Sequence, residues 1–129
     1  MKTIEQYLIF FLLIHWLADF ALQTHKQAIG KGEGKNFFNR ELLKHVSVYS
    51  LIWLLISNII EYNWIKALEF SIITFICHYI TDYITSRISK KFFNDNDYHN
   101  GFEVVGFDQI LHYLQLYYTF KFIYYEQII

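Results

Sequence analysis

Apolar residues gather into four long stretches along the chain, and a polar segment separates each stretch from the next. The stretches cover residues 3–24, 40–61, 64–89 and 102–126. Twenty helical residues, rising 1.5 Å each, span about 30 Å, which is the thickness of the hydrocarbon core of a bilayer. Each stretch exceeds that length, so the pattern predicts four helices that are long enough to cross a membrane.

The polar connectors predict where these helices end. Residues 25–39, HKQAIGKGEGKNFFN, and residues 92–101, FFNDNDYHNG, are rich in turn-forming and charged residues, which is typical of loops. Asn39 and Asn63 each stand just before an apolar stretch, where an asparagine side chain can accept hydrogen bonds from free amides of the first helical turn. The segment GKGEG lacks the preceding strand and the Lys-Ser/Thr ending of a phosphate loop, so we interpret it as flexible.

Positive charge is concentrated in and beside these two connectors. The basic residues are Lys26, Lys31, Lys35, Arg40 and Lys44 around the first, and Arg87, Lys90 and Lys91 before the second. Loops rich in lysine and arginine remain on the cytoplasmic side of a membrane. We therefore expect a multi-pass protein with both connectors in the cytoplasm and both termini outside.

Composition agrees with a single helical domain that covers residues 1–129. Hydrophobic residues make up 54% of the chain, above the 45–50% that is usual for soluble domains, and the net charge is −1. Without a basic stripe, we do not expect nucleic acid as a partner. The one cysteine excludes an intrachain disulfide. The mean hydropathy of +0.19 is low for four membrane spans, which keeps a soluble all-helical bundle as an alternative.

Ionisable residues recur inside the apolar stretches in one arrangement, an imidazole and a carboxylate four positions apart. Residues with this spacing share one face of a helix. With one further histidine in the second stretch, the set comprises His15, Asp19, His45, His78, Asp82, Asp108 and His112. Because consecutive helices run in alternating directions, all seven fall at a similar depth in the cytoplasmic half of the bundle. We therefore expect them to lie together.

Four imidazoles and three carboxylates favour a divalent metal, with zinc, manganese or iron best suited to such ligands. Charged groups within a membrane usually pair or face an interior cavity. The set exceeds what one tetrahedral ion needs, so we predict that the seven residues bind one or two ions. Asp19 or Asp82 could instead act as a general base, and Gln23 or Gln109 could orient the ligands or bind substrate. Lys44, beside His45, could attract an anionic substrate.

Two other interpretations remain open at this point. The histidines and aspartates could form a hydrogen-bond network that only fixes helix packing. Alternatively, the protein could be an ion or proton conduit, or a phage-type factor that acts on a host membrane partner. A conduit needs a polar track through both leaflets, whereas the segments YLIFFLL and LIWLLISNII contain no ionisable group other than tyrosine. The adjacent His-Asp dipeptide of the best-known soluble helical phosphohydrolases is absent.

Four motifs resemble a family of small bacterial and phage membrane proteins of uncharacterised activity, the domain of unknown function 3307. The motifs are HWLADFALQ (15–23), LLKHVSVYS (42–50), FICHYITDY (75–83) and GFDQILHYL (106–114), in this order. The resemblance implies polar positions at His15, Asp19, Gln23, His45, His78, Asp82, Asp108, Gln109 and His112, and all are present. The chain departs from the pattern mainly in a short, asparagine-rich second loop. It is similar, more distantly, to bacterial inner-membrane metal-dependent hydrolases whose helices carry His and Asp.

Together these features predict an all-α, four-helix transmembrane bundle in a bacterial inner membrane, with the lipid bilayer as its partner. The predicted function is metal-dependent hydrolysis at the cytoplasmic leaflet. We expect phosphate esters as substrates, either a phosphate-containing lipid or a nucleotide, because bound metals neutralise phosphoryl charge.

Overall fold

The computed structural model describes residues 4–126, and all regular secondary structure in this part of the chain is helical. The elements are η1 (Ile4–Tyr7), α1 (Leu8–Trp16), η2 (Leu17–Ala21), α2 (His25–Gly30), α3 (Arg40–Glu61), α4 (Trp64–Asn94) and α5 (Tyr98–Tyr124). The predicted all-α class is confirmed. The predicted first residue of the first helix, residue 3, lies outside the described residues.

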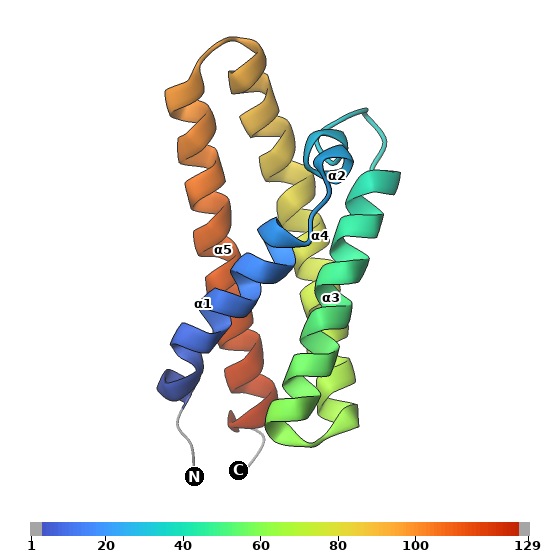
Figure 1. Ribbon diagram of the computed structural model, residues 1–129, viewed down its shortest axis with the longest axis vertical. Helices are drawn as coiled ribbons and strands as arrows, with labels where there is room; N and C mark the ends of the chain where they lie inside the picture. The colour runs from blue at the N-terminus through green and yellow to red at the C-terminus, as the bar shows by residue number, and fades with distance from the viewer. Residues whose placement is uncertain (1–3, 127–129) are drawn as a thin grey trace.

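Three long helices form the body of the protein, and α4 packs against both α3 and α5. The helix α1 crosses obliquely in front of them and contacts α5 (Figure 1). The start of η1, the α3–α4 turn and the last turn of α5 lie at one end of the bundle, which we call the terminal end (Figure 1). The short helix α2 and the α4–α5 turn lie toward the opposite end, which we call the loop end.

Two asparagine caps set the starts of the central helices as predicted. The Asn39 side chain accepts a hydrogen bond from the Leu42 amide at 2.9 Å, and α3 covers residues 40–61 as expected. The Asn63 side chain accepts one from the Lys66 amide at 3.1 Å, at the start of α4. These bonds satisfy amides that have no partner within the helix.

The predicted loop at residues 25–39 is wrong in its first part, because α2 forms there. Thr24 and Gln27 make a reciprocal capping box: the Gln27 amide donates to Thr24 Oγ1 at 3.2 Å, and the Thr24 amide donates to Gln27 Oε1 at 2.9 Å. This motif starts a helix without any apolar periodicity, which explains why the hydrophobic pattern does not reveal α2.

The predicted loop at residues 92–101 is also wrong in extent. The helix α4 continues to Asn94, α5 begins at Tyr98, and only residues 95–97 form the turn. The Asp97 side chain accepts hydrogen bonds from the amide and the side chain of Asn100 at 3.2 and 2.6 Å. A cap of this kind lets polar residues enter a helix that composition alone assigns to a loop.

The first helical segment changes its winding after Trp16, where α1 ends and η2 begins. In η2 the Leu22 amide donates to the Leu17 carbonyl at 3.0 Å, a bond that spans five residues and defines a π-helical turn. Such turns are rare in proteins, and those that occur are often found at functional sites. Asp19 lies within this turn.

An aromatic core fills the half of the bundle nearer the terminal end. Phe11, Trp53, Phe70 and Phe120 are all buried there. The rings of Phe11 and Phe120 meet edge to face with centroids 4.9 Å apart, and those of Phe11 and Trp53 lie 5.3 Å apart. Such pairs add a directional stabilisation to the burial of apolar area. This core therefore joins α1, α3, α4 and α5 into one unit.

The outer surface is apolar where the interior is polar. Five isoleucines spaced four residues apart follow one face of α4, and each is 44–51% exposed: Ile72, Ile76, Ile80, Ile84 and Ile88. On the same helix His78 and Asp82 are buried. Among the described residues, the segments Ile4–Ala21 and Arg40–Glu61 are the two that are long and apolar enough to cross a membrane; α4 and α5 do not meet this criterion.

Two alanine substitutions on α5 should differ strongly in their effect on stability, because Phe120 belongs to the aromatic core and Phe122 does not. Phe120 is fully buried, so we expect Phe120→Ala to lower the free energy of unfolding by about 3–5 kcal/mol. Phe122 is 55% exposed, so Phe122→Ala should change it by no more than about 0.5 kcal/mol. Denaturant unfolding of the purified variants measures both values, and equal losses would contradict this description of the core.

Candidate metal centre

Seven ionisable side chains from separate elements meet in the half of the bundle nearer the loop end. They are His15 of α1, Asp19 of η2, His45 of α3, His78 and Asp82 of α4, and Asp108 and His112 of α5, and all seven are buried. The three pairs predicted from four-residue spacing are in contact within each pair, at 3.6 Å for His15 and Asp19, 3.4 Å for His78 and Asp82, and 3.2 Å for Asp108 and His112.

Four of these residues form a first group: Asp19, His45, His78 and Asp82. The Nε2 atoms of His45 and His78 lie 3.2 Å apart. Asp19 Oδ1 lies 3.0 and 3.5 Å from these two nitrogens, respectively. Asp82 Oδ2 lies 3.4 Å from each of them. Two imidazole nitrogens and two carboxylate oxygens therefore enclose one small space.

The spacing within this first group fits a tetrahedral metal ion. Ligand atoms bonded at about 2.0–2.1 Å to a tetrahedral ion lie about 3.3–3.4 Å from one another. The five measured separations, 3.0–3.5 Å, bracket that value. The imidazoles must lose the Nε2 proton to bind a metal, so occupation would release protons. The first group could therefore hold a divalent ion with little rearrangement.

A second group contains Asp19, Asp108 and His112. His112 Nε2 lies 3.2 Å from Asp108 Oδ2 and 3.0 Å from Asp82 Oδ1. Asp19 belongs to both groups, so its carboxylate could supply a ligand atom to an ion in either one. With three protein ligands, the second group leaves a coordination position for water or substrate, as catalytic metal sites do.

His15 stands apart from both groups because each of its ring nitrogens has a protein partner. Its Nε2 lies 2.7 Å from Gln109 Oε1, and its Nδ1 lies 2.7 Å from the Tyr49 hydroxyl. An amide oxygen can only accept, so Nε2 carries the proton and Nδ1 accepts from Tyr49. The Gln109 amide in turn donates to Asp19 Oδ2 at 3.2 Å and to Asp108 Oδ2 at 3.1 Å. His15 and Gln109 thus orient the carboxylates that the second group uses.

Tyr49 and Thr85 also belong to the site and are absent from the predicted set, although helical spacing could have revealed both. Tyr49 follows His45 by four residues on α3 and is fully buried beneath the site. Thr85 follows Asp82 by three residues, and its hydroxyl donates to Asp108 Oδ1 at 2.5 Å. Both hydroxyls lie on the same helix faces as the predicted ligands.

Lys31 was also missed, and no local pattern could have revealed it. The residue belongs to the GKGEG segment, yet its side chain is only 15% exposed and donates to Asp82 Oδ2 at 2.8 Å. Burial lowers the pKa of Lys31, but the carboxylates of Asp82 and Asp19 raise it more, so the pKa lies above its ordinary value. A protonated ammonium therefore lies against the first group.

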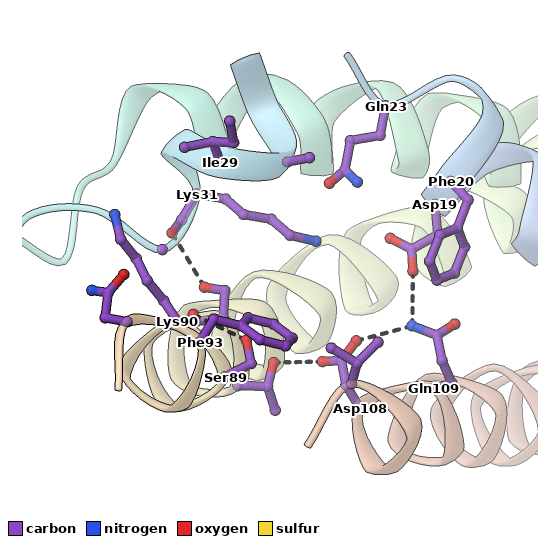
Figure 2. A pocket seen from close by; sticks show the side chains of 16 residues that line it. Asp19, Phe20, Gln23, Ile29, Lys31, Ser89, Lys90, Phe93, Asp108 and Gln109 are labelled. Carbon is purple, nitrogen blue, oxygen red and sulfur yellow. Dashed lines mark hydrogen bonds between the residues drawn. The ribbon is translucent and has the colours of Figure 1, made fainter. Parts of the chain in front are cut away.

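A cavity of about 390 Å³ adjoins the centre and is lined by residues of η2, α2, α4 and α5. Asp19, Asp108 and Gln109 form the wall that belongs to the centre. In Figure 2 the Lys31 side chain extends across this space toward Asp19, and the Gln23 amide points into it. Gln23 Oε1 is buried without a hydrogen-bond partner in the described part of the chain. The second group therefore faces a cavity, whereas His45, His78 and Asp82 of the first group do not line it.

Lys44, which the sequence analysis proposed as a substrate contact, does not line the cavity. Its ammonium lies 3.1 Å from Glu41 Oε1, and the side chain is 45% exposed. The structure therefore brings Lys31, and not Lys44, to the ionisable cluster.

A family model described as "Protein of unknown function (DUF3307)" matches residues 7–128. The chain belongs to the DUF3307 family. The match includes every residue of the two groups, so the site lies within the part of the chain that defines the family. No curated protein and no solved structure matches this DUF3307 chain.

Removing the buried ammonium should strengthen metal binding by this DUF3307 protein. In Lys31→Met, a charge-assisted hydrogen bond worth about 1.5–3 kcal/mol no longer competes for Asp82. We expect the Kd for Zn²⁺ or Mn²⁺ to fall on the order of tenfold to a hundredfold, measured by competition with a fluorescent chelator. Lys44→Met is the matched control, because Lys44 pairs with Glu41 outside the centre. Unchanged or weaker binding in Lys31→Met would contradict the assignment.

Proposed function

We propose that this DUF3307 protein is a membrane-embedded, metal-dependent hydrolase that acts on a phosphate ester near the cytoplasmic leaflet. The observation that carries the proposal is the first group, whose four ligand atoms have the spacing of a tetrahedral shell. The second group supports it further, because three ligands beside a cavity resemble the open arrangement of catalytic metal sites.

The ligand chemistry favours Zn²⁺, with Mn²⁺ or Fe²⁺ as the other candidates, since imidazole and carboxylate suit all three. Bound here, such an ion would supply a Lewis acid and lower the pKa of water toward about 7. Of the two predicted bases, Asp19 is the better placed to accept a proton from that water, because it lines the cavity and Asp82 does not. Gln109 holds Asp19 Oδ2 and Asp108 Oδ2 in place during this transfer.

The proposed reaction is an ordinary hydrolysis. A water oxygen forms a bond to phosphorus, the ester P–O bond breaks, and the departing alcohol oxygen gains a proton. The protonated Lys31 side chain lies in the cavity wall and would attract the phosphoryl oxygens. No group other than water and the ester is consumed.

Membrane embedding is supported by the distribution of polarity across the fold. The isoleucine face of α4 is exposed while the histidines and aspartates are buried, the reverse of a soluble protein. Two segments are long and apolar enough to span a membrane, and we propose that α4 and α5 also cross it, shielding their polar residues inside the bundle. The basic residues of the connectors lie toward the loop end, so we assign that end to the cytoplasm and both termini to the outside.

The aromatic core is an argument against a conduit. Toward the terminal end the polar centre is followed by Phe11, Trp53, Phe70 and Phe120, which are buried and in mutual contact. An ion or proton crossing the membrane would have to pass this layer, whose four named side chains carry no ionisable group. A one-sided centre is therefore the better interpretation, and a network that only fixes packing is its remaining rival.

Metal content separates the centre from a packing network. We expect the protein, purified without chelators, to hold at least one equivalent of a divalent metal, and His78→Ala and Asp82→Ala to lose it, because each removes a ligand of the first group. His99→Ala is the matched control, since His99 is exposed on α5 and pairs with Glu103. Elemental analysis of the three variants measures this. A metal-free wild type after reconstitution would favour the packing network.

Hydrolytic activity separates an enzyme from a structural metal protein. Asp19→Asn keeps the size of the side chain but removes the proton acceptor that faces the cavity, so we expect phosphate release to fall on the order of 10²–10⁴-fold. The assay is phosphate release from a panel of phosphoesters by the metal-loaded protein. If the wild type holds metal but hydrolyses no ester in the panel, the enzyme part of the proposal fails.

A further inference from the structure

Two chemically different sets of side chains line the cavity beside the centre. The polar lining includes Lys31, Gln23, Asp108 and Gln109. The apolar lining consists of Phe20, Ile29, Phe93 and Val105, which come from η2, α2, α4 and α5. Figure 2 shows Phe20, Ile29 and Phe93 around the same space as Lys31 and Asp108. A ligand that fills the cavity therefore needs a charged part and an apolar part.

The charge of the polar lining indicates the chemical class of the ligand's charged head group. The Lys31 ammonium crosses the space between α2 and the centre and is held by Asp82, deep in the wall. Lys90, also in the lining, pairs with Glu33 at 2.9 Å. A cation that replaced Lys31 at Asp82 would leave the Lys31 ammonium free for an anion. The Gln23 side chain also lines the cavity and carries an amide N–H group that can donate to an anion. An ammonium and an amide beside a candidate metal ion favour a phosphate group.

The apolar lining indicates that the group esterified to this phosphate is apolar. About 390 Å³ is within the range of small-molecule sites, and it is more than a phosphate alone requires. Phe20 and Ile29 are 44% and 50% exposed, so the apolar lining reaches the surface of the protein. An apolar chain could enter at these residues and lie along Phe93 and Val105.

We propose that this cavity binds a phosphate ester of an aliphatic alcohol, with the phosphate at Lys31 and the second metal group and the alkyl chain against Phe20, Ile29, Phe93 and Val105. The inference rests on the proposed function for the location of the reacting group and names its substrate class. The apolar lining would bind the alkyl chain of the ligand, and the Lys31 ammonium and the candidate metal centre would bind its phosphate.

The test is binding of straight-chain monoalkyl phosphates, from ethyl to hexyl, at concentrations at which they form no micelles. Calorimetry on the metal-loaded and the metal-free protein measures Kd without any turnover. Burial of each added methylene should lower the Kd of the wild type about fourfold until the cavity is filled. Inorganic phosphate gives the contribution of the head alone, and adenosine monophosphate represents the nucleotide class.

Two adjacent positions of α5 provide a matched pair of variants. Val105 lines the cavity, so Val105→Trp should fill it and abolish the dependence on chain length. At Gly106 an added Cβ atom meets nothing within 4 Å, and the residue does not line the cavity. Gly106→Trp should therefore keep the dependence, and it corrects for partition of the chains into detergent. If Val105→Trp does not fold, Ile29→Lys places a charge on the half-exposed wall of α2 and should have the same effect.

The possible outcomes are distinct. A wild-type Kd that does not fall with chain length, or falls equally in Val105→Trp or Ile29→Lys and in Gly106→Trp, overturns the inference. Tighter binding of adenosine monophosphate than of hexyl phosphate overturns it in favour of a nucleotide. A chain-length dependence that the cavity variants lose supports it even if no ester is hydrolysed. In that case the proposed catalytic function fails and the binding site remains.

Discussion

The negative charge of three buried carboxylates is the constraint on which the rest of this structure depends. Asp19, Asp82 and Asp108 lie inside a helical bundle where charge is costly unless it is paired. Their partners are the four histidines, the Gln109 amide, the Thr85 hydroxyl and the Lys31 ammonium. A divalent cation would satisfy the same carboxylates with more charge in less space. The buried groups could therefore hold a metal ion in place of some of these partners.

The two halves of the bundle have different structural roles: one packs aromatic rings, and the other contains the buried carboxylates. Near the terminal end, aromatic rings from four segments interlock and fix the helices relative to one another. Toward the loop end the same helices present their polar faces to a common point. Because the helices are fixed by the aromatic half, ligands from separate elements can stay at ligand distances even though the carboxylates repel one another. The aromatic core and the ionisable cluster thus form successive layers along the same helices.

Asp19 links the closed and the open parts of the centre. Its Oδ1 atom faces the imidazoles of His45 and His78, while Oδ2 accepts a hydrogen bond from Gln109. The π-helical turn of η2 contains this residue at the point where α1 gives way to the α2 connector. Of the two groups, only the second shares two members, Asp19 and Asp108, with the cavity wall. The first group is thereby suited to hold an ion, and the second to present one to a ligand.

The sequence by itself determined the helical class, the bounds of α3, the starts set by Asn39 and Asn63, and the three His/Asp pairs, because spacing along a helix fixes which side chains share a face. Helix α2 and the short α4–α5 turn followed from capping bonds that a hydrophobic pattern does not register. Only the tertiary structure separated His15 from the two ligand groups and brought Lys31 to Asp82 from 51 residues away. Contacts between elements depend on how helices cross and where a connector folds back, and no local spacing encodes either.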